Sequence, residues 1–196
     1  MKKVIVLPQT YHRIQKALVA AKNQYEIGGV LVGHKLPDGY VLLGATTPPD
    51  TQEKALAEFY LDGEYHAAEA EKISKRFWGR PKIVGIWHSH ICDGATFSKQ
   101  DGISNEQISR LYGGAISAIA TMWDKELTLN SYYVVPDGSF RMCRQFVIQD
   151  RRRRKMDGQN RCSNCIYWVH RTCVVTGQTK NDSLCTCGQF KPRTEK

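Results

Sequence analysis

The hydrophobic pattern along the first 148 residues switches repeatedly between the two-residue period of strands and the longer period of helices. Strand-like runs occur at 4–7, 26–33, 40–43, 83–87, 115–123, 127–135 and 139–148. Helix-like segments occur at 11–23, 65–78 and 103–111. Because strands and helices interleave without a strict repeat, we predict an α+β fold, or α/β-like sandwich, in which helices flank a mixed central β-sheet.

Local signals refine several of these elements. Thr10 stands just before the first helical segment and is the expected N-cap. The run 83–87 is apolar on both faces, so we expect a buried central strand that leads directly into His88. Pro-Asp-Gly sequences at 37–39 and 136–138 carry the residues that tight turns favour, and each predicts a β-hairpin.

The chain length of 196 residues leaves room for one ordinary domain and a short appendage. Apolar residues make up 41% of the chain, which suits a main domain that folds unaided. Residues 151–196 carry 11 of the 28 Lys and Arg but only 3 of the 19 Asp and Glu. We therefore expect a main domain at 1–150, a basic linker at 151–161 and a cysteine-rich tail at 162–196.

Location can also be inferred from composition. The apolar run near the amino terminus has four residues, fewer than the roughly 7 to 15 of a secretory signal. No window approaches the roughly 18 consecutive apolar residues of a membrane span. Seven cysteines, an odd number crowded toward the C-terminus, suit metal ligation in a reducing compartment better than a disulfide framework. We expect a soluble, cytoplasmic protein that does not bind membranes.

Two histidines and an aspartate have the spacing of a metal site. His88 and His90 are two residues apart, so on a strand their side chains point to the same face. Ser98 follows ten residues after the first histidine, and Asp101 follows three residues later. Two histidines and one carboxylate form a three-ligand catalytic zinc set, in which the fourth position is open to water.

Other interpretations stay open for parts of this pattern. A His-x-His sequence often occurs by chance, and Ser98 with Asp101 also fits a helix capping box, although capping and ligation can coexist. Asp93 is a competing carboxylate for the metal. Glu64 and His66, at the start of a predicted helix, can line a cleft, but a solvated helix face is the simpler interpretation.

The whole pattern resembles the JAMM motif of the MPN-plus (JAB) zinc metalloproteases, whose defining positions here are His88, Ser89, His90, Ser98 and Asp101. Residues 26–33 resemble the small-residue strand at whose start this family carries a catalytic glutamate. Ile91 stands where many members have proline, whereas Gly94 matches the turn glycine of that loop. The resemblance covers residues 1 to about 148.

This resemblance implies a JAB/MPN-like fold of the prokaryotic, stand-alone type. It implies that His88, His90 and Asp101 hold zinc. Glu26 would be the catalytic base hydrogen-bonded to the metal's water, and Ser98 would steady the oxyanion. Zinc can lower the pKa of bound water to roughly 7, and a nearby carboxylate can take its proton. The implied activity is cleavage of a peptide or isopeptide bond at the C-terminus of a ubiquitin-like or small carrier protein.

The cysteine pattern of the tail predicts a second metal site. Its candidate ligands are the thiols of Cys162, Cys165, Cys173, Cys185 and Cys187. A four-cysteine zinc site explains the spacing, and an iron–sulfur cluster, which uses the same ligand type, is the open alternative. The basic residues nearby can bind an acidic protein or a nucleic acid, although most such runs are solvated linkers.

Two functions of other classes compete with the hydrolase. A non-catalytic MPN-type scaffold would hold partners together, but it predicts lost ligands, and none is lost here. An adaptor would bind a protein or nucleic acid through its basic, cysteine-rich tail, with the front domain as a support. Because one fold hosts many activities, the site has to decide between them.

Overall fold

The computed structural model describes residues 1–22, 24–49, 61–78, 80–91, 94–124 and 126–148, with the backbone of 168–169 and 172–173. Outside these residues lie the predicted linker at 151–161, Asp93, and four tail cysteines, Cys162, Cys165, Cys185 and Cys187. Cys173 is described in its backbone alone. The tail metal site therefore stays a prediction.

Eight strands form one mixed sheet, in chain order β1 (Lys3–Val6), β2 (Gly28–Leu36), β3 (Gly39–Ala45), β4 (Lys82–Ser89), β5 (Ala115–Trp123), β6 (Glu126–Val134), β7 (Phe140–Met142) and β8 (Arg144–Val147). Their order in the sheet is β7-β6-β5-β4-β2-β3-β1-β8. The pairs β1–β3, β1–β8 and β4–β5 are parallel, and the other neighbours are antiparallel. Two short strands, β9 (Trp168–Val169) and β10 (Thr172–Cys173), pair separately.

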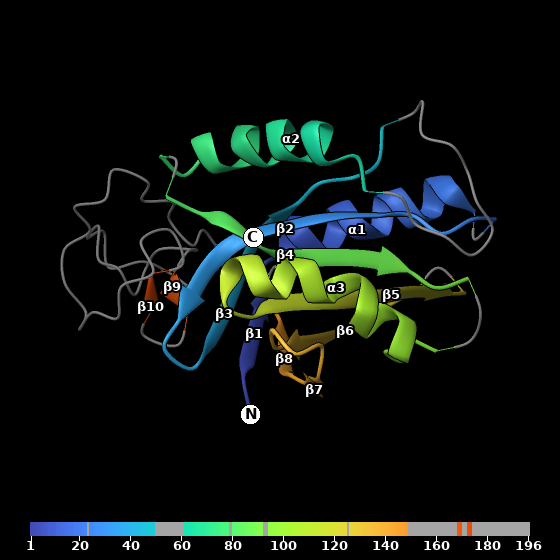
Figure 1. Ribbon diagram of the computed structural model, residues 1–196. Coiled ribbons are helices and arrows are strands. Elements are labelled where there is room, and N and C mark those ends of the chain that lie inside the picture. Colours follow the sequence, from blue (N-terminus) through green and yellow to red (C-terminus); the bar gives the residue numbers. More distant parts are fainter. Residues whose placement is uncertain are drawn as a thin grey trace.

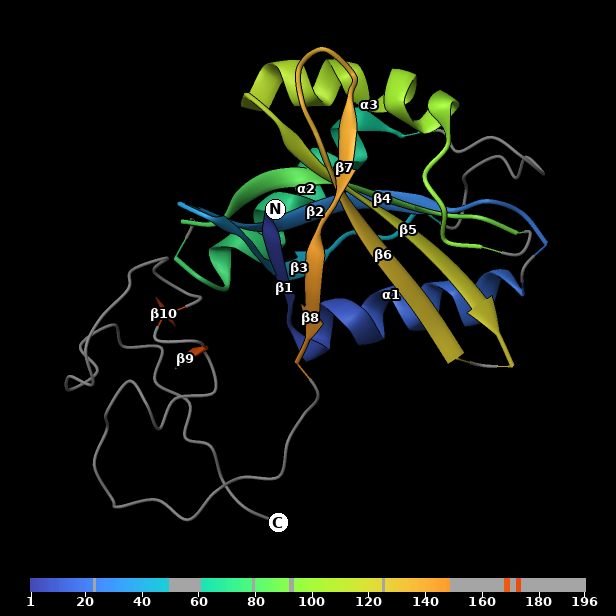
Figure 2. The ribbon, with the colours of Figure 1, turned by 90° about the horizontal axis from the view of Figure 1, so that it is seen from below.

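Three helices, α1 (Pro8–Ala21), α2 (Gly63–Lys75) and α3 (Lys99–Tyr112), complete the described fold. Figure 2 shows α1 on one side of the strands and α3 on the other. The mixed α+β character and the flanking helices predicted from the sequence are confirmed. Among the described residues, no helix has the length and apolar character needed to cross a bilayer.

Strand β4 is buried on both faces, as its apolar sequence predicts. On one face, Trp87 belongs to a buried cluster that includes Ile14 and Leu18 of α1. On the other face, Ile86 belongs to a second cluster that includes Ile73 of α2. Removing apolar surface from water is favourable on either side, so this central strand is the rigid base from which the site residues extend.

Helix α1 begins three residues before the segment predicted from its apolar spacing. Pro8 stands in the first turn, directly after the N-cap residue Leu7. Proline is tolerated there because the first helical N–H groups have no partner within the helix. The prediction of Thr10 as the N-cap was wrong. Thr10 lies inside the helix, fully buried, and its hydroxyl donates to the Leu42 carbonyl at 3.0 Å.

The last predicted strand, 139–148, is two strands in the structure. β7 pairs with β6 in an antiparallel hairpin, as the turn sequence predicts. The chain then passes through Cys143, which is buried, and β8 pairs in parallel with β1, where Ile5 lies opposite Phe146. A purely local pattern could not predict this division, because it depends on a partner strand at the other end of the domain.

One end of the sheet brings together three segments that are distant in sequence. Figure 1 shows β4 ending and α3 beginning at the same end of the molecule. β2 runs antiparallel to β4, with Gly28 opposite His88, so the start of β2 lies at this end too. Residues just before β2, just after β4 and at the start of α3 are therefore neighbours.

Candidate metal centre

Two histidines meet at the carboxyl end of β4. His88 is the penultimate residue of the strand and is 6% exposed, and His90 follows the strand directly. The His90 backbone N–H donates to the Ala120 carbonyl of β5 at 3.0 Å, which holds the residue against the neighbouring parallel strand. The Nε2 atoms of the two imidazoles lie 3.2 Å apart. The i, i+2 spacing thus brings two nitrogen ligands to one point.

Asp101 reaches the same point from helix α3. Its backbone N–H donates to Ser98 Oγ at 3.1 Å, and its Oδ2 accepts the Ser98 backbone N–H at 2.7 Å. This reciprocal capping box fixes the carboxylate at the start of the helix. Asp101 Oδ1 lies 2.9 Å from His88 Nε2, and Oδ2 lies 3.6 Å from His90 Nε2. One side chain therefore caps the helix and joins the histidines.

These three side chains make a donor set that fits a metal ion. One ligand atom from each lies within 4.8 Å of those of the other two. Among the described residues, this is the one group of three or more potential ligands that meet in this way. Two imidazole nitrogens and a carboxylate oxygen are a set that leaves a coordination position open for chemistry.

The charges within the cluster favour an ionised carboxylate. Burial alone would raise the pKa of Asp101, but the hydrogen bonds from His88, His90 and Ser98 outweigh it and hold that pKa well below its usual range. The hydrogen bond to Asp101 raises the pKa of His90, against the opposing effect of burial. The raised pKa of His90 favours a protonated imidazole beside the carboxylate, and a bound cation would take the place of that positive charge.

Glu26 lies beside the cluster, in the segment that leads into β2. The next residue is clamped to β4: the Ile27 N–H donates to Ser89 Oγ at 2.9 Å, and the Ser89 N–H donates to the Ile27 carbonyl at 2.7 Å. Burial raises the pKa of Glu26, while the two nearby histidines of the cluster lower it. Glu26 is thus close enough to respond to the candidate ligands, and a raised pKa suits a group that exchanges protons.

Ser89 is a positioning residue that the sequence analysis included in the motif but gave no role. It is the middle residue of the His-x-His pattern, so its side chain points away from the imidazoles, and it is 1% exposed. Its hydroxyl ties the Glu26 segment to the strand that carries the histidines. A hydroxyl residue between two strand histidines was the available signal. Ser98 contacts Asp101 as its cap, and its expected contact with an oxyanion stays a prediction.

His66 is buried, and its assignment to a solvated helix face was wrong, whereas Glu64 is exposed as expected. His66 Nδ1 lies 2.6 Å from Thr46 Oγ1, which also accepts the Val30 N–H at 2.8 Å. Trp87 Nε1 donates to the Thr46 carbonyl at 2.8 Å. Burial lowers the pKa of His66, although two nearby carboxylates oppose the shift. Through Thr46, which directly follows β3, this network joins α2 to β2 and β4.

Comparison with known proteins gives a likeness in fold. No protein-family model matches the chain, and no curated protein matches it. Among solved structures, the chain is similar to the solution structure of protein DSY2949 from Desulfitobacterium hafniense. The sequence identity is 14%, the TM-score is 0.56, and the match covers 74% of this chain and 93% of that chain. At this identity the likeness concerns the fold alone, so the chemistry has to be argued from the site.

Proposed function

We propose that this protein is a zinc-dependent hydrolase of the JAMM (MPN-plus) type, with a JAB/MPN-like fold. The observation that carries the proposal is the convergence of His88, His90 and Asp101 with Glu26 beside them. These residues come from the end of β4, the start of α3 and the approach to β2. Their meeting needs both the β2–β4 register and the start of α3, so chance spacing in the sequence does not explain it.

Zinc is the metal proposed for this cluster. Imidazole suits zinc, whereas magnesium and calcium sites consist mainly of oxygen ligands. The same donor set also serves non-haem iron(II), but a carboxylate placed beside the ligands favours hydrolysis. A zinc ion held by these residues supplies Lewis acidity, which makes a water molecule acidic near neutral pH and polarises a carbonyl group.

Each neighbouring residue has a role in this proposal. Glu26 accepts a proton from the attacking water and delivers it to the leaving amine, for which a pKa raised by burial is favourable. Asp101 stays anionic because of its hydrogen bonds and offers the metal a negative charge. The Ser98 hydroxyl oxygen accepts the Asp101 N–H, so the hydrogen of this hydroxyl group stays available to an oxyanion.

The proposed substrate bond is a peptide or isopeptide bond at the C-terminus of a ubiquitin-like or small carrier protein, in the cytoplasm. The JAMM resemblance supports this substrate class. His90 is partly exposed, so a polypeptide can approach the cluster from solvent. The function is enzymatic rather than that of a scaffold, because a scaffold does not require the base and all three ligands to meet.

A second metal in the tail is part of the proposal. The five tail cysteines would bind zinc or an iron–sulfur cluster, and the basic linker would dock an acidic protein or a nucleic acid. Visible absorption by the purified protein separates the two metals, because an iron–sulfur cluster is coloured and zinc is not.

Elemental analysis of the full chain tests the front metal site. Asp101→Ala should hold one zinc fewer per chain than the parent, because an apolar side chain cannot replace the carboxylate ligand. Asp38→Ala is the matched control, since Asp38 is an exposed carboxylate paired with Lys3 at a turn. Equal zinc content in Asp101→Ala and the parent would show that the metal is held elsewhere, and iron in place of zinc would overturn the choice of metal.

A further inference from the structure

A cavity of about 800 Å³ lies beside Glu26, between helix α1 and the segments that precede β2 and follow β3. Ligand sites commonly have volumes of roughly 300 to 1,000 Å³, so this cavity is large enough to hold a short segment of a substrate chain. None of the three candidate zinc ligands is among its described lining residues. The cavity is therefore a separate space that adjoins the candidate active site at Glu26.

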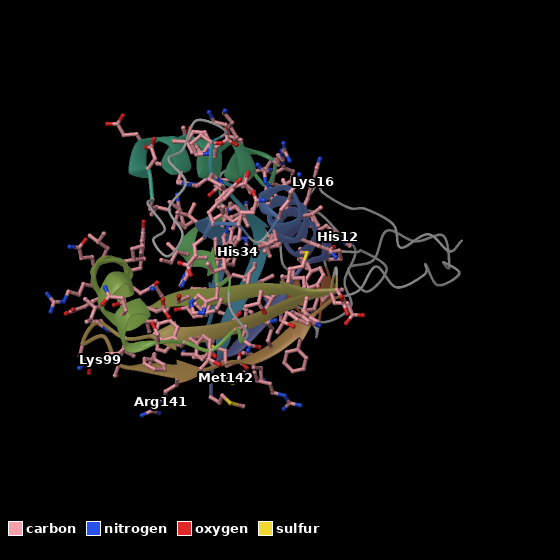
Figure 3. The ribbon with its side chains drawn as sticks, turned by 90° about the vertical axis from the view of Figure 1, so that its right-hand side faces the viewer. His12, Lys16, His34, Lys99, Arg141 and Met142 are labelled. Carbon is pink, nitrogen blue, oxygen red and sulfur yellow. The ribbon has the colours of Figure 1, made fainter. Side chains whose placement is uncertain are left out.

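Helix α1 supplies a basic wall. His12, Arg13 and Lys16 line the cavity. Figure 3, which views the molecule from the end at which β4 stops, labels His12 and Lys16 on α1. Arg13 Nη2 lies 3.7 Å from Glu69 Oε2, but Glu69 is held more closely by Lys72, at 2.6 Å. Lys16 makes no ion pair with any residue that the structure describes. An incoming anion thus meets Lys16 and also Arg13, whose ion pair with Glu69 is a long one.

The rest of the described lining is small, apolar or neutral, apart from one acid. Ala17, Ala20 and Ala21 continue the cavity along α1, and Pro48 lies in the segment after β3. Glu26 is the one carboxylate in the described lining. The lining therefore has a negative group next to the candidate chemistry and a positive wall further along α1.

We propose that this cavity binds an acidic segment of the polypeptide substrate, a few residues from the bond that Glu26 helps to cleave. The inference rests on the proposed hydrolase function and specifies the chemistry of its substrate. The Glu26 carboxylate repels an acidic residue at the bond itself, whereas Arg13 and Lys16 attract one beyond it. Residues without a negative charge should therefore flank the bond, with Asp or Glu next along the chain.

A peptide fits this cavity better than a nucleic acid does. Single-stranded nucleic acids bind along extended basic grooves in which aromatic rings stack on successive bases. Here the cations stand on one wall of a compact space, Gln9 and three alanines complete the lining along α1, and Tyr25 is the one aromatic ring other than His12 in the described lining. Alanine methyl groups suit the CH₂ groups of peptide side chains, and the lysine and arginine suit their carboxylates.

The test is the binding of two labelled peptides of equal length, one rich in Glu and one with Gln at the same positions. Fluorescence anisotropy would measure their affinity for the zinc-loaded full chain at low and moderate salt. Replacing both cations, Arg13→Gln with Lys16→Gln, should weaken binding of the Glu peptide about fivefold, the scale of two partly screened ion pairs. Binding of the Gln peptide should not change, and the fivefold difference should shrink with salt.

The matched control is Lys35→Gln with Lys82→Gln, which removes the same charge from exposed residues at the other ends of β2 and β4. This variant should bind both peptides like the parent. An equal loss in both double variants, or no loss in the first, means that the attraction lies elsewhere on this basic chain and overturns the proposal. Tighter binding of a single-stranded oligonucleotide, with the same dependence on Arg13 and Lys16, overturns the choice of peptide.

The same experiment separates this inference from the hydrolase proposal. If the Glu peptide binds through Arg13 and Lys16 but the protein cleaves no amide bond, the acidic-segment site stands and the hydrolase proposal fails. If the protein cleaves amide bonds but shows no preference between the two peptides, in binding or in KM, the hydrolase proposal stands and the acidic-segment site fails.

Discussion

Ser98 and Asp101 hold each other through two reciprocal hydrogen bonds, and the same Asp101 carboxylate lies 2.9 Å from His88 Nε2. The start of α3 is therefore both a helix terminus and one side of the candidate metal centre. Because the cap positions the ligand, a change in the cap should alter metal affinity as well as helix stability.

Ser98→Ala should lower the free energy of unfolding by about 1 kcal/mol, the usual cost of losing an N-cap. Zinc affinity should fall about tenfold, because the Asp101 carboxylate loses part of its support. Ser98→Thr keeps a capping hydroxyl and should retain most of both properties. Thermal unfolding and zinc titration against a competing chelator provide the two measurements. Reduced stability with unchanged zinc affinity would show that the cap does not position the ligand.

Ser89→Ala should slow hydrolysis while the protein keeps its zinc. Without the hydroxyl, the buried Ile27 N–H has no acceptor, which costs about 1 to 3 kcal/mol, and the Glu26 segment can move away from β4. Ser131→Ala is the control, because Ser131 is another buried serine, bonded to Gln145 on β8 rather than to the Glu26 segment. A similar fall in kcat for both variants would indicate general destabilisation instead of a positioning role.

The contact between His90 and Asp101 makes the stability of the metal-free protein depend on pH in two directions. The pKa of His90 is raised, so its contribution is present below the unfolded value of about 6.5 and is lost as pH rises through the folded pKa. The pKa of Asp101 is lowered, so its contribution is present above about 3.9 and is lost as pH falls through the folded pKa. The pair should stabilise the metal-free protein most between about pH 4 and 6.5.

The stabilisation by zinc should increase as pH rises, which is opposite to the pH dependence of the contribution of His90 in the metal-free protein. The metal binds the neutral imidazole, so protons compete with it below the raised pKa of His90. The increase in Tm caused by zinc should therefore grow as pH rises from about 5.5 to 8, which calorimetry with and without a chelator can measure. His12→Gln, which changes an exposed histidine on α1, should show the same growth. A zinc effect on Tm that does not vary with pH would contradict the assignment of His90.

Thr46→Val should destabilise the protein by about 2 kcal/mol or more. The substitution removes the acceptor of the Val30 N–H and the partner of His66 Nδ1, and both groups are buried. Glu64→Ala, at an exposed position on the same helix as His66, should change the stability by less than about 0.5 kcal/mol. Denaturant unfolding measures both. An unchanged midpoint for Thr46→Val would mean that the network does not hold α2 to the sheet.

Local sequence patterns predicted those helices and strands whose structure depends on residues within the same segment. The bounds of β5 agree with the predicted run, because alternation and turn residues are local signals. Thr10 was assigned wrongly because its role depends on Leu42, which lies on β3. The division at Cys143 was missed because β8 pairs with β1, at the far end of the domain's sequence.

In the candidate site, too, local features could be predicted and contacts between distant segments could not. The pairing of His88 with His90 and the cap formed by Ser98 and Asp101 could be predicted, because each depends on neighbouring residues at the end of one strand or the start of one helix. The meeting of Asp101 with the histidines was expected from the motif resemblance, because no local pattern shows how α3 packs against β4. The clamp made by Ser89 could not be predicted, because it forms only when β2 pairs with β4. The cavity along α1 also arises from packing between distant segments and leaves no sequence spacing to recognise.

Cleavage by zinc-loaded parent and Glu26→Gln, measured on a ubiquitin-like protein fused at its C-terminus to a reporter, is the most direct test of the hydrolase proposal. The parent should release the reporter. Glu26→Gln should keep its zinc and lose about 10²- to 10⁴-fold in kcat, because an amide cannot accept the proton from water. Gln24→Ala, an exposed neighbouring change, should cleave like the parent. Cleavage by Glu26→Gln at the parental rate, with zinc present in both samples, would contradict the proposed role of Glu26 and the mechanism built on it.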